Sequence, residues 1–295
     1  MAALPKDLAD LLTRPPIYRL MATADLISGE DEHLNPTWRG LVGIPESIEP
    51  SVPMAIKYLG QSSVKISIEL ACGLAAIALK LPVPKPALVY CDRRDLPSLP
   101  HSVVGDTVLV FGSSFTPEDT IWARAKADSS FAEELIWQRV CSDTVGSKGA
   151  AWDELIANPD RHHHNLIFDG LKWWLFDHDK AIPSAGKFTN ANSQSHMLNE
   201  FPGFVSRANI LAREMLKRRP SDHAITLQPI EFEKQRDRLK AFAMLLSNWK
   251  VSDARLQGIL TDAALLAGLI ASRLPSLAMH LSNRVGQKNG DTLWT

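Results

Sequence analysis

Cysteine is scarce in this sequence, and none of the cysteines forms a CxxC motif. The three that occur, Cys72, Cys91 and Cys141, are odd in number and widely spaced, which excludes a disulfide framework and a cysteine-based zinc finger. Glycine and proline, with 16 and 19 residues, are too few for a fibrous or low-complexity chain. The remaining class is the ordinary globular protein, and a length of 295 residues fits about two domains or one domain with two lobes.

Long apolar runs are scarce as well. The apolar run around Cys72, residues 70–79, is too short to cross a bilayer. The first twelve residues lack the basic start and the apolar stretch of a signal peptide. We therefore expect a cytoplasmic protein without a membrane partner.

Neither sign of charge dominates, because 32 Lys and Arg residues face 33 Asp and Glu residues. The balance hides an asymmetry between the two ends of the chain. Residues 203–288 carry 14 basic and 7 acidic side chains, a net +7, whereas residues 1–202 carry 18 and 25, a net −7. This pattern predicts a polarised surface with a basic C-terminal part. The overall charge gives no reason to require nucleic acid as a partner.

Local patterns predict a β-containing first part and a helical second part. Short β-branched segments indicate strands, and longer periodic segments indicate helices. The expected strands are residues 17–23, 52–58, 88–91 and 108–111. The expected helices are residues 62–80, 129–143, 150–157, 204–217, 229–249, 252–273 and 274–284, with a polar loop over 183–203.

One hairpin carries most of the chemistry. Asp169-Gly170 between two apolar stretches predicts a two-residue turn in which Phe168 pairs with Leu171. In this register Asp177 lies across from His162. The hairpin then gathers four oxygen-bearing side chains near one end: Asp160, Asn165, Asp177 and Asp179.

These side chains favour magnesium chemistry but leave other interpretations open. Carboxylates and an Asn oxygen suit Mg²⁺ that also binds substrate phosphates, and a further Asp is available as a base toward a hydroxyl. Asn-Pro-Asp and Asp-Gly also occur in ordinary surface turns. A metal-dependent phosphohydrolase is the third alternative, built on the aspartates and on His162, His163, His164 and His178. Three consecutive histidines on a strand, however, cannot all face one ion.

The motif Asp160-Arg-His-x-x-Asn165, with a hairpin and Asp177 after it, resembles the catalytic core of HipA-like kinases. It is similar, more distantly, to the phosphoinositide lipid kinases. The resemblance implies that Asp160 is the catalytic base, that Asn165 and Asp177 hold Mg²⁺, and that Arg161 and His162 support the loop. The shorter HipA-like proteins often continue with Asp-His-Gly, whereas this chain has Asp177-His178-Asp179. Asp179 therefore either adds a metal ligand or only replaces the glycine.

Upstream motifs extend the resemblance over residues 50–182. Met54-Ala-Ile-Lys57 resembles the strand lysine motif of protein kinases, and Glu69 follows twelve residues later in a predicted helix. The resemblance implies a Lys57–Glu69 pair that acts on the nucleotide phosphates. Residues 108–114 resemble the connector between the lobes. This places the nucleotide beside Val110, Phe111, Gly112 and His162.

The loop that should cover the phosphates is matched poorly. Residues 27–40 stand in its expected position, but they contain only two glycines and three acidic residues. Such a loop does not cradle phosphates readily. The departure favours the runner-up interpretation, which is a catalytically weak kinase-shaped binding module of a toxin or defence system.

The leading prediction is an ATP- and Mg²⁺-dependent kinase with a two-lobed α+β, protein-kinase-like fold. The N-lobe is expected over residues 1–112, and a helical C-lobe carrying the catalytic loop and the hairpin over residues 113–295. The expected reaction transfers the γ-phosphoryl group of ATP to a Ser or Thr hydroxyl. The acceptor, protein or small molecule, is left open, and the resemblance implies a toxin–antitoxin setting with an antitoxin or other protein partner.

Overall fold

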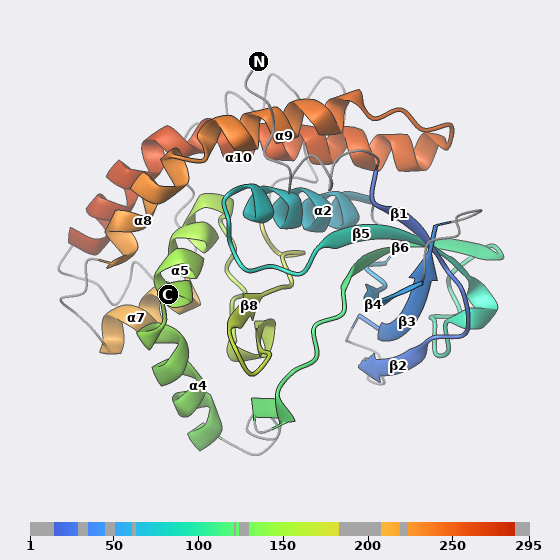
Figure 1. Ribbon diagram of the computed structural model, residues 1–295, viewed down its shortest axis with the longest axis horizontal. Helices are drawn as coiled ribbons and strands as arrows, with labels where there is room; N and C mark the ends of the chain where they lie inside the picture. The colour runs from blue at the N-terminus through green and yellow to red at the C-terminus, as the bar shows by residue number, and fades with distance from the viewer. Residues whose placement is uncertain are drawn as a thin grey trace.

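A curved sheet forms the first part of the chain (Figure 1). Its strands are β1 (Ile17–Leu20), β2 (Asp25–Ser28), β3 (Thr37–Gly43), β4 (Val52–Lys57), β5 (Pro86–Asp92) and β6 (Thr107–Ser114). They lie in the order β1-β5-β6-β4-β3-β2, and β1 also pairs with β3, so that the sheet closes into a small barrel. The computed structural model describes residues 15–28, 35–44, 51–60, 63–120, 122–123, 130–182, 208–218 and 224–286.

The barrel interior is a separate apolar core. Residues of β3 alternate between exposed and buried positions, which is the period that a strand with one buried face requires. Trp38, Ile56 and Val110 are completely buried in this interior. Gly40 is required there, because a Cβ at this position would lie 2.6 Å from Leu20 Cδ1. The barrel therefore folds around its own side chains and presents its outer surface to the rest of the protein.

Strands β2 and β3 were not predicted from the sequence. Residues 27–40 were expected as a loop over the phosphates, but β2 and β3 pair antiparallel at both ends of this stretch. The buried positions Trp38, Gly40 and Val42 of β3 alternate with Arg39 and Leu41, and the central glycine conceals the strand pattern. The middle of the expected loop, residues 29–34, lies outside the described residues.

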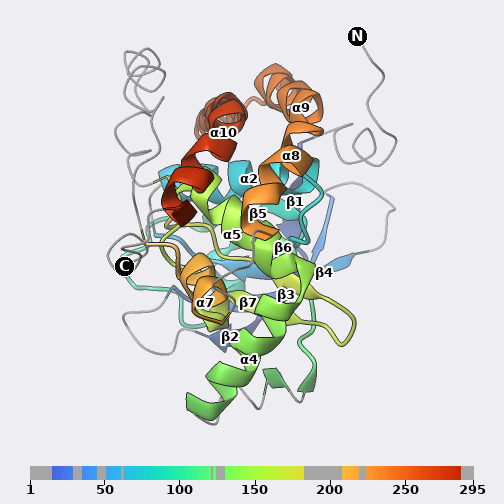
Figure 2. The same cartoon turned by 90° about the vertical axis from the view of Figure 1, so that its left-hand side faces the viewer.

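Helices make up most of the remaining chain. They are α2 (Ser63–Ala78), α4 (Ser130–Ser142), α5 (Thr144–Ile156), α7 (Ile210–Arg218), α8 (Ala224–Glu233), α9 (Arg236–Asn248) and α10 (Ala254–Gly286). Short elements follow α5: the 3-10 turn η2 (His163–Asn165) and the hairpin of β7 (Leu166–Phe168) and β8 (Trp173–Leu175). Seen from the helical end, α5 lies between α8–α10 above and α4 and α7 below (Figure 2). This arrangement is the expected α+β division into a β-containing first part and a helical second part.

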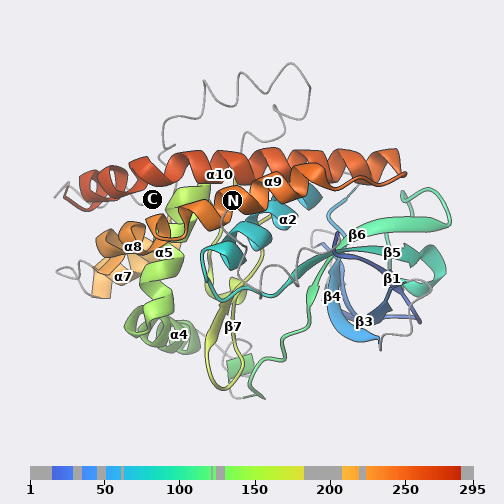
Figure 3. The same ribbon diagram turned by 45° about the horizontal axis from the view of Figure 1, so that its top comes forward.

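Helix α2 joins the two parts. It contains small and apolar residues, and Gly73 packs so closely on Pro86 that a Cβ would lie 2.9 Å from the proline ring. Its buried side chains belong to the same core as those of the C-terminal helices, not to the barrel interior. The Ser67 hydroxyl lies 3.3 Å from the Ile259 carbonyl of α10. Figures 1 and 3 show α10 passing over α2 and continuing above α5.

The C-terminal helices differ from the predicted ones at their boundaries. Residues 229–249 form parts of α8 and α9 instead of one helix, and the predicted helices 252–273 and 274–284 are one continuous α10. Pro275 stands inside α10 on an exposed position, while its neighbours Leu274 and Leu277 are buried. Packing on the buried face offsets the single backbone hydrogen bond that the proline removes.

Helix α10 is long and apolar enough to cross a membrane by length and composition alone. In the structure, 56% of its most apolar stretch is buried within the protein. It packs against α2, α5, α8 and α9. These contacts are those of a core helix.

The hairpin has a different register from the predicted one. Phe168 pairs with Trp173 instead of Leu171, and Leu166 pairs with Leu175. The Asp169 carboxylate accepts hydrogen bonds from the backbone N–H groups of Leu171 and Lys172, both at 2.9 Å. These bonds widen the turn by two residues. Because the shift is even, each side chain stays on its predicted face, and the two ends of the hairpin still meet.

Candidate functional site

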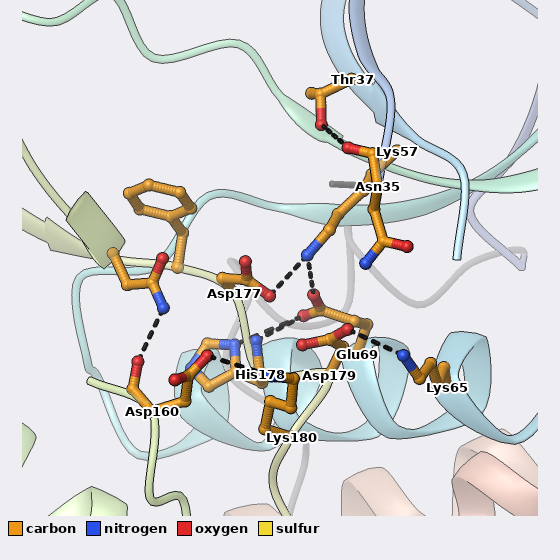
Figure 4. Close-up of polar contacts among 12 residues, drawn as sticks. Asn35, Thr37, Lys57, Lys65, Glu69, Asp160, Asp177, His178, Asp179 and Lys180 are labelled. Carbon is orange, nitrogen blue, oxygen red and sulfur yellow. Dashed lines mark hydrogen bonds and ion pairs between the residues drawn. The ribbon is translucent and has the colours of Figure 1, made fainter. Parts of the chain in front are cut away.

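Lys57, the last residue of β4, is the centre of a charged cluster between the barrel and the helices (Figure 4). Its ammonium lies 2.6 Å from Asp177 Oδ1 and 4.0 Å from Glu69 Oε1. Burial acts to lower the pKa of Lys57, but Asp177 and Glu69 outweigh it and raise the pKa above its usual value. Lys57 therefore carries a permanent positive charge between two carboxylates.

Helix α2 supplies two side chains of this cluster from successive turns. Glu69 Oε2 accepts a hydrogen bond from the backbone N–H of His178 at 3.0 Å. Lys65, four residues earlier on the same helix face, places its ammonium 3.5 Å from Asp179 Oδ2. Burial, and next the charge of Asp177, raise the pKa of Glu69 to about 7. The helix thus holds the segment 177–179 through one carboxylate and one ammonium group.

Asp177 lies on the chain directly after the hairpin and has an uncommon backbone conformation. Its φ of 62° is in the left-handed region, which Asp tolerates better than most residues. Burial acts to raise the pKa of Asp177, but the charge of Lys57 and its hydrogen bond hold this pKa at about 2. Burial raises the pKa of the neighbouring Asp179. A cation is therefore bound to each of the two carboxylates: Lys57 to Asp177 and Lys65 to Asp179.

His178 lies between these two aspartates, is buried, and contacts side chains of α5 and α2. The indole N–H of Trp152 donates to His178 Nε2 at 3.3 Å, so the ring proton lies on Nδ1, which faces Glu69 Oε2 at 3.6 Å. Burial, and next the charge of Arg161, lower the pKa of His178 to about 3. The ring is neutral and fixes the segment between α5 and α2.

The loop of residues 160–165 is held from beneath by a buried ion pair. The guanidinium of Arg161 donates to both carboxylate oxygens of Asp153, at 3.2 and 3.0 Å, and neither side chain is exposed. The same guanidinium donates to the carbonyl oxygens of Asn165 and Phe176. One arginine therefore fixes both the loop before β7 and the residue that precedes Asp177.

Asp160 lies at the open side of this loop, where its carboxylate is one-third exposed. Its nearest basic partners are Lys180 Nζ at 3.8 Å and His162 Nε2 at 3.9 Å. Asn165 donates from Nδ2 to the Asp160 carbonyl at 2.7 Å, which closes the loop. The Asp160 carboxylate is accessible, whereas the backbone that carries it is fixed.

The donor set fits a magnesium ion that is shared with a nucleotide. Asp177 and Asp179 already attract cations, and the hydrogen bond from Asn165 Nδ2 leaves its amide oxygen as an acceptor. Within the described ranges, no three His, Cys, Asp or Glu side chains are arranged to hold a metal ion by themselves. Mg²⁺ needs only one or two carboxylates when phosphates complete its coordination. The described histidines at 162–164 do not form the centre that a phosphohydrolase would require.

The structure places the predicted connector residues on different sides of the barrel wall. Val110 is completely buried in the barrel interior, and a Cβ on Gly112 would lie 2.7 Å from the Val89 side chain. Phe111 pairs with Lys57 and lies on the outer face, where it packs against the helical core. β6 continues to Ser114, past the expected lobe boundary at residue 112. The chain leaves the sheet after Ser114, where the Phe115 N–H still donates to the Pro53 carbonyl of β4.

Several functional partners were not identified from the sequence. Asp153 and Trp152, which support Arg161 and His178, lie in α5 without a local motif that marks them. Lys65 could have been found from its spacing of four residues to Glu69 on one helix. Lys180 lies three residues after Asp177, and only the folded hairpin shows that it reaches Asp160.

No protein-family model matches the sequence, and no curated protein matches it significantly. Among solved structures, the chain is similar to the crystal structure of the proinflammatory kinase CtkA of Helicobacter pylori. The two align with a TM-score of 0.51 and 11% sequence identity, over 90% of this chain and 100% of CtkA. The chain therefore has a kinase-like fold, in which a β-sheet part precedes a helical part. At this identity the likeness concerns the fold alone.

Proposed function

We propose that this protein is an ATP- and Mg²⁺-dependent kinase of the HipA-like type that phosphorylates a Ser or Thr hydroxyl. The observation that carries the proposal is the convergence of Lys57, Glu69 and Asp177 from three separate elements, within contact distance of one another. An ordinary surface ion pair between Lys57 and Asp177 would not require a third, buried partner, and Glu69 is such a partner. The fold likeness to a kinase and the motif around Asp160 support the same conclusion.

Each residue has a distinct role in this reaction. Lys57 would bind the nucleotide phosphates and Glu69 would hold the lysine in place, while Asn165, Asp177 and Asp179 would hold Mg²⁺. When bound, Mg²⁺ neutralises charge on the phosphate oxygens. With nucleotide and metal bound, Lys57 and Asp177, now 2.6 Å apart, would be available to phosphate and to metal respectively.

Asp160 acts on the acceptor. Its exposed carboxylate orients the hydroxyl and takes its proton as the oxygen bonds to the γ-phosphorus, and ADP leaves with the electrons of the broken phosphorus–oxygen bond. Arg161 takes no part in this step and acts as the positioning residue for the loop.

The test is transfer of ³²P from γ-labelled ATP, with and without Mg²⁺, to the protein itself and to a mixed casein–histone acceptor. We expect label only with Mg²⁺. Lys57→Ala should abolish it, and Glu69→Gln should reduce it less, because the glutamate only positions the lysine. A Lys57→Ala variant with the wild-type rate would refute the role of this lysine.

The same experiment separates the runner-up. A kinase-shaped binding module would bind ATP in equilibrium dialysis but transfer no label to any acceptor. Asp92→Asn is the matched control. Asp92 pairs with Arg19 at 2.9 Å on the barrel, outside the cluster around Lys57, so this variant removes a carboxylate from an ion pair without touching the proposed site.

A further inference from the structure

We infer that Arg39, stacked over Phe115, forms the surface on which the base of the nucleotide binds. The inference rests on the proposed function and extends it to recognition of the base. It starts from the strand register, which determines what lies beside Lys57 on the outer face of the barrel.

Directly paired residues of antiparallel strands point to the same side of the sheet. Thr37, Lys57 and Phe111 therefore form one row across β3, β4 and β6. Two residues along each strand, about 7 Å away, Arg39, Ala55 and Ser113 form the next row. If Lys57 binds the phosphates, the base reaches the row that contains Arg39.

Arg39 and Phe115 meet at the outer edge of this row. The Arg39 guanidinium lies over the Phe115 ring, with Cζ 4.7 Å from the ring centroid. Phe115 follows β6 directly, and its N–H donates to the Pro53 carbonyl at 3.1 Å, so the ring is anchored to β4. The Arg39 side chain is exposed, which leaves the guanidinium free to meet a ligand.

The pair has the right chemistry for a flat aromatic base. A guanidinium is planar, always charged and stacks on aromatic faces, and a phenyl ring stacks on the same kind of surface. A cation over an aromatic ring contributes modestly at an exposed site and more where a bound base covers it from water. The phosphates are assigned to Lys57, which lies in the neighbouring row of the sheet.

The experiment compares ATP with tripolyphosphate, which carries the phosphates without the base, by calorimetry on the full chain with Mg²⁺. Arg39→Met should weaken ATP binding about three- to tenfold and leave tripolyphosphate binding unchanged. Arg39→Lys should be intermediate, because it keeps the charge but not the plane. Arg19→Met is the matched control, since Arg19 is an exposed arginine elsewhere on the barrel.

The outcomes separate the two proposals. If Arg39→Met weakens neither ligand while Lys57→Ala weakens both, the inference is wrong and the proposed function stands. Equal weakening of both ligands would assign Arg39 to the phosphates and also overturn the inference. If the wild-type protein binds neither ligand, both proposals fail. Thermal melting of each variant shows whether the fold is retained.

Discussion

The two walls of the site are held by different kinds of contact. On the barrel and α2 side, the contacts of Lys57 with Asp177 and of Lys65 with Asp179 each include a partly exposed side chain, although Asp179 itself is buried. Beneath the loop of residues 160–165, the Arg161–Asp153 pair is fully buried, and the arginine also holds two backbone carbonyls. The first wall consists of contacts that a ligand can exchange, whereas the second consists of contacts that fix geometry. Substitutions in the first should change binding and turnover, and substitutions in the second should change stability.

The largest effect is expected at Asp177. Asp177→Asn should remove Mg²⁺-dependent ATP binding and reduce turnover by about 10³-fold or more, because a metal contributes several kcal/mol to the transition state. Calorimetry with ATP, with and without Mg²⁺, measures the change. Unchanged affinity at saturating Mg²⁺ would show that Asp177 only pairs with Lys57. Asp92→Asn serves as the control.

Asp160 should separate turnover from binding. Asp160→Asn should lower the transfer rate by about 10²–10⁴-fold, because the base is lost. ATP affinity should stay within about twofold, since the nearest partners of this carboxylate are Lys180 and His162 and not Lys57. Rate and affinity are measured on one preparation. A loss of ATP affinity at Asp160 that is absent at Asp177 would reverse the two roles.

Substitutions in the buried Arg161–Asp153 pair should lower the stability of the fold. Arg161→Met leaves Asp153 as a buried charge without its partner and should cost about 3–5 kcal/mol of unfolding free energy in urea. Combining it with Asp153→Asn should recover part of this loss, because no charge then remains. Arg19→Met removes an exposed pair and should cost about 0–1 kcal/mol. Equal effects of the two arginines would contradict the distinction between the walls.

The smallest effect is expected from lowering the pH, which should reduce the free energy of unfolding by protonating Asp177. The folded-state pKa of Asp177, about 2, is below its ordinary 3.8. Its ion pair therefore stabilises the protein above pH 3.8, and this stability is lost as the pH falls through 2. Between these values, wild type should lose about 1–2 kcal/mol more than Asp177→Asn. Urea unfolding of both proteins at pH 4.5 and 2.5 measures this difference. An equal loss of unfolding free energy in wild type and Asp177→Asn would contradict the pairing with Lys57.

The sequence predicted the parts of the site that lie close together along the chain. Asp160, Asn165 and Asp177 belong to one motif, and the two-residue register error kept their faces, so the structure still brings them together. The resemblance of Met54-Ala-Ile-Lys57 to the strand lysine motif implied a pair of Lys57 with Glu69, and the two side chains lie 4.0 Å apart.

What the sequence could not predict depends on distant packing or on a side chain in a turn. The Asp169 carboxylate widens the hairpin through hydrogen bonds that no periodicity shows. The partner of Arg161 lies in the preceding helix and is recognised only when both side chains are buried. The strand β3 was missed because Gly40, at its centre, interrupts the apolar residues on the inner face of the barrel.

The position of α10 over α2 limits how this protein can be controlled. Glu69 and Lys65 belong to α2. The buried face of α2 packs in one core with α10, and the Ser67 hydroxyl donates to a backbone carbonyl of α10. An outward swing of α2 would therefore open a large apolar contact to water. Inhibition by turning Glu69 away from Lys57 would therefore require α2 to separate from α10, a helix of 33 residues. Control by a ligand bound at Lys57 and Asp177, or by a partner that covers Asp160, would leave that packing undisturbed.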